Sequence, residues 1–189
     1  MNCLIKSFEN FGIFWDWQEV KKLASKILTE QSKDLLVSAY LSKALVETEG
    51  YTGLLLALHI NYELITHFWP ICFPPIKRLR ARESALNWFS EKLGSFLEQQ
   101  PPKETEHQLI IYAYDLLYEL INELDTQFEG SGPSLLELSK PLKQYQKMAK
   151  ASLQQKEQQQ QKQDQLKELA DIEQEEKTKF KVQIPHDGR

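Results

Sequence analysis

Apolar residues recur at steps of three and four positions through most of the first 130 residues, the spacing of one face of an α-helix. The first such segment is WDWQEVKKLASKIL, residues 15–28. Asp16 is a residue type that caps helix N-termini, and Glu19 follows at the capping-box spacing. The predicted apolar stripe comprises Trp17, Val20, Leu23, Ala24, Ile27 and Leu28. We expect an amphipathic helix here.

Two more helices are predicted on either side of Gly50. The segment from Ser32 to Gly50 has apolar residues over more than one stripe, so we expect neighbours on two sides of it. The segment 51–68 carries apolar residues at steps of three and four. It must end near Phe68, because a proline at position 70 disfavours the α conformation in the residue before it.

A fourth helix is predicted over 79–98 and a fifth over 104–127. Gly94 lies inside the fourth helix and indicates either a bend or close packing, since glycine costs about 1 kcal/mol relative to alanine there. In the fifth helix one line holds Leu109, Ala113, Leu116, Leu120 and Leu124. No segment alternates with a period of two. The predicted class is all-α, with antiparallel helical pairs packed in a bundle or short solenoid.

The character of the chain changes after EGSGPS, residues 129–134. Eighteen of the 20 Phe, Trp and Tyr residues precede position 130, and eight of the 12 residues 154–165 are Gln. Ser134 with Glu137 can cap one further helix. We predict a helical domain over 1–130 and, over 131–189, a helical or disordered Gln-rich tail that leads to a C-terminal region absent from this chain. A coiled coil is the less favoured alternative, because sustained apolar heptads are lacking.

Charge and cysteine content narrow the functional classes. Residues 1–130 carry 12 Lys and Arg against 18 Asp and Glu, a balance of −6, and the remainder carries 11 against 9, or +2. An acidic domain repels phosphate backbones, so we expect no general nucleic-acid binding. The two cysteines, Cys3 and Cys72, form no disulfide framework. Neither a secretory signal nor a run of 18 apolar residues is present, so a cytoplasmic location is expected.

Candidate catalytic and metal sites are weak. His59, Glu63 and His67 share a helical face, but the two histidines lie two turns apart, about 12 Å along the axis, too far for one zinc ion. A polar outer face is the favoured interpretation. The nucleophile-elbow, phosphate-loop and dinucleotide-binding motifs are all missing. We therefore predict a protein without enzymatic activity, cofactor or metal.

The stretch HFWPICFPPIKRLRARESALNWF, residues 67–89, admits three interpretations: a binding site, a catalytic loop or a structural junction. Arg78 and Arg82 share a helix face, whereas Arg80 points elsewhere. An anion or RNA site would need more basic partners. The favoured alternative is that one or more arginines bridge to nearby carboxylates or to backbone carbonyls freed at the Pro-rich turn.

The region from Ser32 to Pro75 and the following RLRARESALNWF resemble the N-terminal domain of TssA-like (ImpA-related) proteins of the bacterial type VI secretion system. The resemblance lies in an S-K-D-L opening, a T-E-G turn at 48–50, F-W-P at 68–70 and an R-x-x-A-L-x-W frame at 82–88. The D-W before the first helix fits as well. Together these features cover about residues 16–90.

The resemblance implies a non-enzymatic helical module that caps or organises the contractile sheath and tube through protein contacts. The implied partners are sheath, tube, baseplate or TssA-type subunits, with a homo-oligomer expected because contractile tails are symmetric. Members differ in their C-terminal parts: some act at the baseplate, whereas TagA- or VasL-like members act at the distal end. The implied location is cytoplasmic, including the inner face of the inner membrane, with membrane contact only through an absent C-terminal region. A generic helical adaptor that binds a partner helix or peptide remains the alternative.

The resemblance also implies structural roles for four residues. Trp69 and Trp88 would anchor the core, Pro70 would fix the turn by locking its φ angle, and Arg82 would tie the turn down. On this interpretation the stretch 67–89 is a packing junction of the fold.

Overall fold

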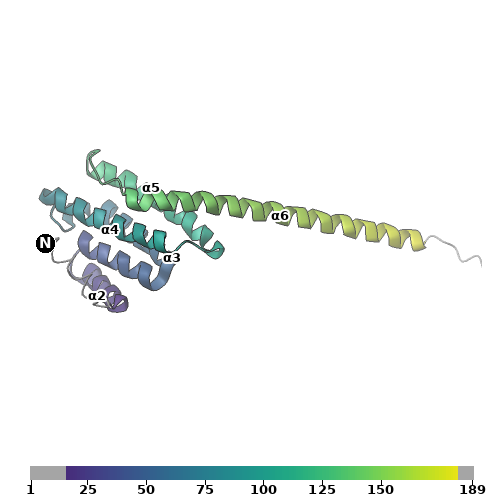
Figure 1. Ribbon diagram of the computed structural model, residues 1–189, viewed down its shortest axis with the longest axis horizontal. Helices are drawn as coiled ribbons and strands as arrows, with labels where there is room; N and C mark the ends of the chain where they lie inside the picture. The colour runs from purple at the N-terminus through teal and green to yellow at the C-terminus, as the bar shows by residue number, and fades with distance from the viewer. Residues whose placement is uncertain (1–15, 183–189) are drawn as a thin grey trace, which may run out of the picture. The chain divides into compact units, whose positions relative to one another are not determined.

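The computed structural model describes residues 16–182, and beyond Leu169 it describes the side chains of Ile172 and Glu173 only. Cys3, the start of the predicted first domain and residues 183–189 lie outside the described residues. The elements in chain order are α2 (Trp17–Glu30), α3 (Leu35–Phe68), η1 (Trp69–Ile71), η2 (Ile76–Arg78), α4 (Leu79–Gln99), η3 (Glu104–Glu106), α5 (His107–Gln127) and α6 (Leu136–Val182) (Figure 1). The described range holds no strand, only an isolated bridge between Asp34 and Phe73. The all-α prediction is confirmed.

Helix α3 consists of two arms that meet at Gly50. That residue has φ 59° and ψ −131°, a backbone conformation that residues other than glycine rarely adopt. The arms approach closely, because a Cβ atom at Gly53 would lie 2.2 Å from the carbonyl oxygen of Leu45. The two helices predicted on either side of Gly50 are therefore present as an antiparallel pair, and the second ends at Phe68 as expected.

A buried polar network joins the two arms of α3. The Oγ of Ser38 donates to Oδ1 of Asn61 at 3.0 Å, and Nδ2 of Asn61 donates to Oγ of Ser42 at 2.9 Å. Nδ2 also donates to the Ala57 carbonyl oxygen at 2.8 Å. All three polar side chains are buried, and because their hydrogen bonds are satisfied they fix the register of the arms at little net cost.

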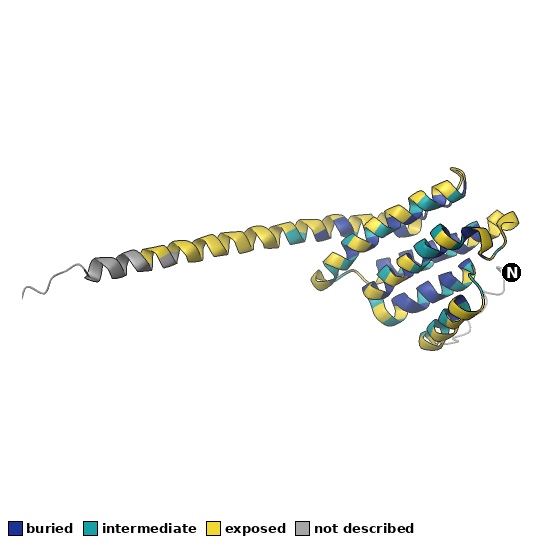
Figure 2. Cartoon of the chain, turned by 180° about the vertical axis from the view of Figure 1, so that it is seen from behind, coloured by how far each residue is buried: buried dark blue, intermediate teal, exposed yellow. Residues whose placement is uncertain are grey.

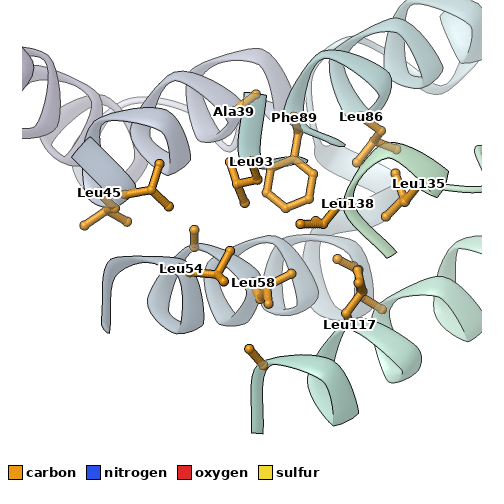
Figure 3. Close-up of a cluster of buried hydrophobic side chains, with 14 of the residues drawn as sticks. Ala39, Leu45, Leu54, Leu58, Leu86, Phe89, Leu93, Leu117, Leu135 and Leu138 are labelled. Atoms are coloured by element: carbon orange, nitrogen blue, oxygen red, sulfur yellow. The ribbon is translucent and has the colours of Figure 1, made fainter. Parts of the chain in front are cut away.

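Helices α2, α4 and α5 all pack against α3, which lies at the centre of the arrangement (Figure 1). In Figure 3, labelled side chains from both arms of α3 and from three later helical segments converge on one cluster. The labelled members are Ala39, Leu45, Leu54, Leu58, Leu86, Phe89, Leu93, Leu117, Leu135 and Leu138.

Two predicted stripes differ from the observed ones in detail. In α5 the fully buried residues are Ile110, Ala113, Leu117, Leu120 and Leu124, whereas the predicted Leu109 and Leu116 are only partly buried. In α2, Leu23 is 51% exposed although the pattern placed it on the apolar side. Because apolar residues stand next to one another in these helices, the sequence pattern fixes the rotation of each helix only to within one residue. The packing partners decide which residue is buried.

The compact unit continues into α6 and ends at Ala149, whereas the boundary predicted from the sequence is residue 130. Leu135, Leu138, Leu142 and Ala149 are buried, and this burial extends the unit. Gly94 of α4 explains how α6 comes so close: a Cβ there would lie 2.3 Å from the carbonyl oxygen of Glu137. Close packing is thus the observed reason for the glycine.

The N-terminus of α6 is not closed by Ser134 in the way its sequence suggested. Leu135 has a positive φ of 47°, and its carbonyl oxygen accepts from the N–H of Ser139 at 2.9 Å. The N–H of Leu138 donates to the Oγ of Ser90 on α4 at 3.2 Å. A residue distant in sequence therefore supplies the capping group.

The second unit comprises residues 150–189, of which those up to Val182 are helical. The Gln-rich stretch 154–165 lies in this helix, and its side chains are exposed (Figure 2). Leu166, Leu169 and Ile172 are between 50% and 66% exposed. Over the described part of the chain, no helix is both long enough and apolar enough to span a membrane.

Candidate interaction surface at the Pro-rich connection

The connection between α3 and α4, residues 69–78, is organised by the buried side chain of Arg82. Its Nε donates to the Pro74 carbonyl oxygen at 2.6 Å, and its Nη1 donates to that of Trp69 at 2.9 Å. Its Nη2 donates to the Cys72 carbonyl oxygen at 2.5 Å. The last carbonyls of a helix and those of the turn after it have no partner within the helix, so one guanidinium satisfies three groups that would otherwise be costly to bury.

Aromatic packing completes the environment of Arg82. The guanidinium carbon lies 4.2 Å from the centroid of the Trp69 ring, a cation–π contact, and the Phe128 ring meets Trp69 edge-on at 5.1 Å. Burial lowers the pKa of Arg82 from its ordinary value, but arginine stays charged at neutral pH. The partners are carbonyls and a ring, so the charge is used to hold backbone in place.

A second set of bonds ties the connection to the start of α3. The N–H of Phe73 donates to the Lys33 carbonyl oxygen at 2.7 Å, and the N–H of Leu35 donates to the Phe73 carbonyl oxygen at 2.8 Å. Asp34, between them, caps α3 by accepting from the N–H groups of Leu36 and Val37. The backbone of Phe73 is thereby fixed on both sides.

Cys72 is buried, and its thiol is protonated at neutral pH. Burial raises the pKa of its thiol to about 11, an effect that the positive charge of Arg82 only partly offsets. The thiolate is the reactive form of cysteine, and it is scarce under these conditions.

The outward side of the connection is apolar and basic. Ile71, Phe73, Ile76 and Leu79 are between 42% and 69% exposed. Lys77, Arg78 and Arg80 are exposed between and beside them. An open depression of about 530 Å³ is lined by residues 76–81. We call these seven side chains the loop surface.

The four residues singled out by sequence have different surroundings. Trp69 is 3% exposed and Arg82 is fully buried, whereas Pro70 is exposed in the first turn of η1. Trp88 is only partly buried, against Tyr40 at 4.8 Å between ring centroids. Six positions at about 100° each place Trp88 roughly 120° around the helix from Arg82. Its position at the edge of the core follows from that angle.

The polar face that raised the question of zinc holds a surface contact between a histidine and a carboxylate. Nδ1 of His67 lies 3.1 Å from Oε2 of Glu63, with both side chains exposed, and His59 is exposed one turn before Glu63. Within the range that the structure describes, no three His, Cys, Asp or Glu side chains are grouped so that they could hold a metal ion.

These features define an all-α module whose most organised feature is a buried arginine beneath an exposed apolar and basic loop. Residues 14–91 match the family model described as ImpA, N-terminal, type VI secretion system. Residues 14–91 of this chain are thus similar to the ImpA N-terminal region of type VI secretion proteins. The resemblance drawn from the motifs is confirmed.

A solved structure supports the fold. The chain is similar to the N-terminal domain, including the conserved ImpA_N region, of the TssA component of the type VI secretion system from Burkholderia cenocepacia. The TM-score is 0.63 at 15% sequence identity, and the match covers 75% of this chain and 80% of that one. No match is found among curated proteins.

Proposed function

We propose that the chain is a non-enzymatic assembly component of the type VI contractile tail, which caps or organises sheath and tube polymerisation through protein contacts. The observation that carries the proposal is the match of residues 14–91 to the ImpA N-terminal family model. The loop surface supports binding as the mode of action, since it offers apolar side chains to a partner on a fixed backbone.

The chemistry of the described residues favours binding over catalysis. Arg82 is engaged with three carbonyls, and Cys72 is buried with a raised pKa. His67 is paired with Glu63 on an exposed face. These groups have structural partners already, which accounts for them without a substrate.

The finer assignment is a TagA- or VasL-like member that acts as a homo-oligomer on the cytoplasmic side, at the inner face of the inner membrane. The motifs shared with TssA-like proteins support the tail as the place of action, and the symmetry of contractile tails supports an oligomer. On this proposal the region that separates a baseplate from a distal-end role lies beyond the C-terminus of this chain.

Pull-downs test the proposal. The full chain is immobilised and exposed separately to purified sheath, tube, baseplate and TssA-type subunits, with light scattering after size exclusion to measure its own mass. We expect a multimer that retains sheath or TssA-type subunits. Retention of baseplate subunits alone would assign the baseplate role instead. If no subunit is retained, the assembly role at this domain is wrong, and a generic helical adaptor becomes the better description.

A further inference from the structure

We propose that the loop surface docks an acidic segment of a partner protein, one that carries large apolar side chains among its carboxylates. The inference rests on the proposed function in one respect, that the chain acts through protein contacts. It adds which face makes the contact and what chemistry the partner must bring.

The apolar part of the argument is the density of exposed side chains. Four of the nine residues 71–79 are large hydrophobics that are at least 42% exposed: Ile71, Phe73, Ile76 and Leu79. Single exposed hydrophobics are normal on protein surfaces, but such a concentration is typical of an interaction site. A partner with large apolar side chains would cover them.

The charge of the surface is opposite to that of its domain. Residues 71–82 contain Lys77, Arg78, Arg80 and Arg82 and no acidic residue, whereas residues 1–130 have a balance of −6. Arg82 is buried and committed to carbonyls, which leaves three exposed cations. Among the residues that the structure describes, no carboxylate is within ion-pair distance of these three. Complementary charge therefore selects an acidic partner.

The surface is also held ready for binding. The carbonyls of Cys72 and Pro74, the neighbours of Phe73, both accept from Arg82. The N–H and carbonyl of Phe73 itself are bonded to Lys33 and Leu35. The phenylalanine is thus presented by a backbone that has little freedom left to lose. Binding to such a fixed anchor costs less ordering entropy than binding to a mobile loop.

Nucleic acid is a poorer occupant than an acidic protein segment. A phosphate backbone would meet the three cations but would leave Phe73 and Ile76 exposed, whereas an acidic segment with large apolar side chains would cover both. A second copy of this chain is the remaining occupant to distinguish, since its own domain is acidic.

The experiment uses the full chain and short fluorescent peptides in anisotropy titrations. One peptide is rich in Glu and Leu, a second replaces each Glu by Gln, and a third replaces each Leu by Ser. Overlapping peptides from sheath, tube, baseplate and TssA-type subunits form the second panel. The charge variant is Arg78→Glu with Arg80→Glu, and the apolar variant is Phe73→Ser with Ile76→Ser. Lys140→Glu with Lys143→Glu is the matched control, because both lysines are exposed on the same compact unit.

We expect the Glu and Leu peptide to bind, and each altered peptide to bind about tenfold more weakly or not at all. Both loop variants should lose about tenfold in affinity, with circular dichroism and melting unchanged, while the control variant binds as the wild type does. Equal binding of all peptides, or loss in the control variant as well, would overturn the inference. So would tighter binding of a labelled oligonucleotide, or a dimer that the loop variants dissociate.

The subunit panel separates the two proposals. If subunits are retained in pull-downs but bind equally to the loop variants, the docking surface is wrong and the assembly role stands. If the synthetic acidic peptide binds at the loop while no tail subunit is retained, the docking chemistry stands and the assembly role is wrong.

Discussion

The guanidinium of Arg82 donates three hydrogen bonds to carbonyls from three residues, and it does so with no exposed surface. Replacing it with leucine leaves three acceptors unsatisfied beside the core. We expect Arg82→Leu to lower the free energy of unfolding by about 3–5 kcal/mol. Arg82→Lys should also be destabilising, because one ammonium cannot span the three carbonyls. Urea denaturation measures both.

The control for Arg82 is on the same helix. Arg80 is exposed, so Arg80→Leu should change stability by no more than about 0.5 kcal/mol. An Arg82→Leu variant that unfolds at the wild-type urea concentration would contradict the structural role and would return Arg82 to the list of ligand-binding candidates.

Trp69 allows a core role to be separated from an interface role. It is 3% exposed, with Arg82 over its ring and Phe128 at its edge. Trp69→Ala should therefore lower the free energy of unfolding by about 3–5 kcal/mol. Ile71, two residues later, is 69% exposed, and Ile71→Ala should leave stability nearly unchanged. Thermal unfolding of the two variants measures these changes in stability. A loss below about 1 kcal/mol for Trp69→Ala, with partner binding impaired, would mean that the ring belongs to an interface.

At the scale of elements, the two glycines of α3 make opposite demands on an added methyl group. At Gly50 the space around an added Cβ is open, but φ is 59°. Gly50→Ala should therefore lower the free energy of unfolding by about 1–3 kcal/mol through backbone strain alone. At Gly53 the added Cβ would lie 2.2 Å from a backbone oxygen of the other arm. The two arms must separate to admit the methyl group, so Gly53→Ala should lower the free energy of unfolding by about 3 kcal/mol or more.

Differential scanning calorimetry of the two glycine variants tests this pair. A methyl group at Gly53 that raises the melting temperature, as better helix propensity alone would suggest, would show that the arms are farther apart than described. A loss at Gly53 that is smaller than the loss at Gly50 would contradict the close approach of the two arms.

The connection between α3 and α4 can be followed through Cys72. Its pKa of about 11 lies above the ordinary value, so the thiol is protonated in the native state at neutral pH. Its favourable contribution to stability is fully present below the ordinary pKa and is lost as pH rises toward 11.

In a Cys3→Ser background, native labelling of Cys72 by a thiol reagent should be roughly a hundredfold slower than labelling in denaturant. Arg82→Lys should accelerate it by loosening the connection, whereas Arg80→Lys should not. Rapid labelling of the native wild type would contradict this burial.

Periodicity predicted the helices well because each one buries a face in the same core. Proline and glycine located the ends at Phe68 and Gly50 for reasons of backbone geometry alone. The network around Asn61 escaped prediction, since a polar residue in a helix normally indicates solvent. The carbonyl partners of Arg82 were one of two alternatives, because sequence does not say which backbone groups a turn leaves free. The cap from Ser90 needed the tertiary structure, since it joins residues 48 positions apart.

For the molecule as a whole, the extent of the independently folding unit is the property most open to test. The change in composition after residue 130 favoured a boundary there, because aromatic residues become rare. Aliphatic residues continue the core beyond it: Leu135, Leu138, Leu142 and Ala149 are all at most 2% exposed. A chain that ends at 149 should therefore fold, whereas one that ends at 130 should not.

The chains that end at 130 and at 149 should differ greatly in stability. Each buried leucine contributes about 1.5–3 kcal/mol, and a domain of this size is stable by only about 5–15 kcal/mol in total. Loss of three leucines and of the segment packed on Gly94 should leave 1–130 unfolded or melting far below 1–149. Circular dichroism and calorimetry compare the two truncations with the full chain, and Leu138→Ser in the full chain provides a milder test of the same contact. A cooperative transition in 1–130 at the temperature of 1–149 would restore the boundary predicted from composition.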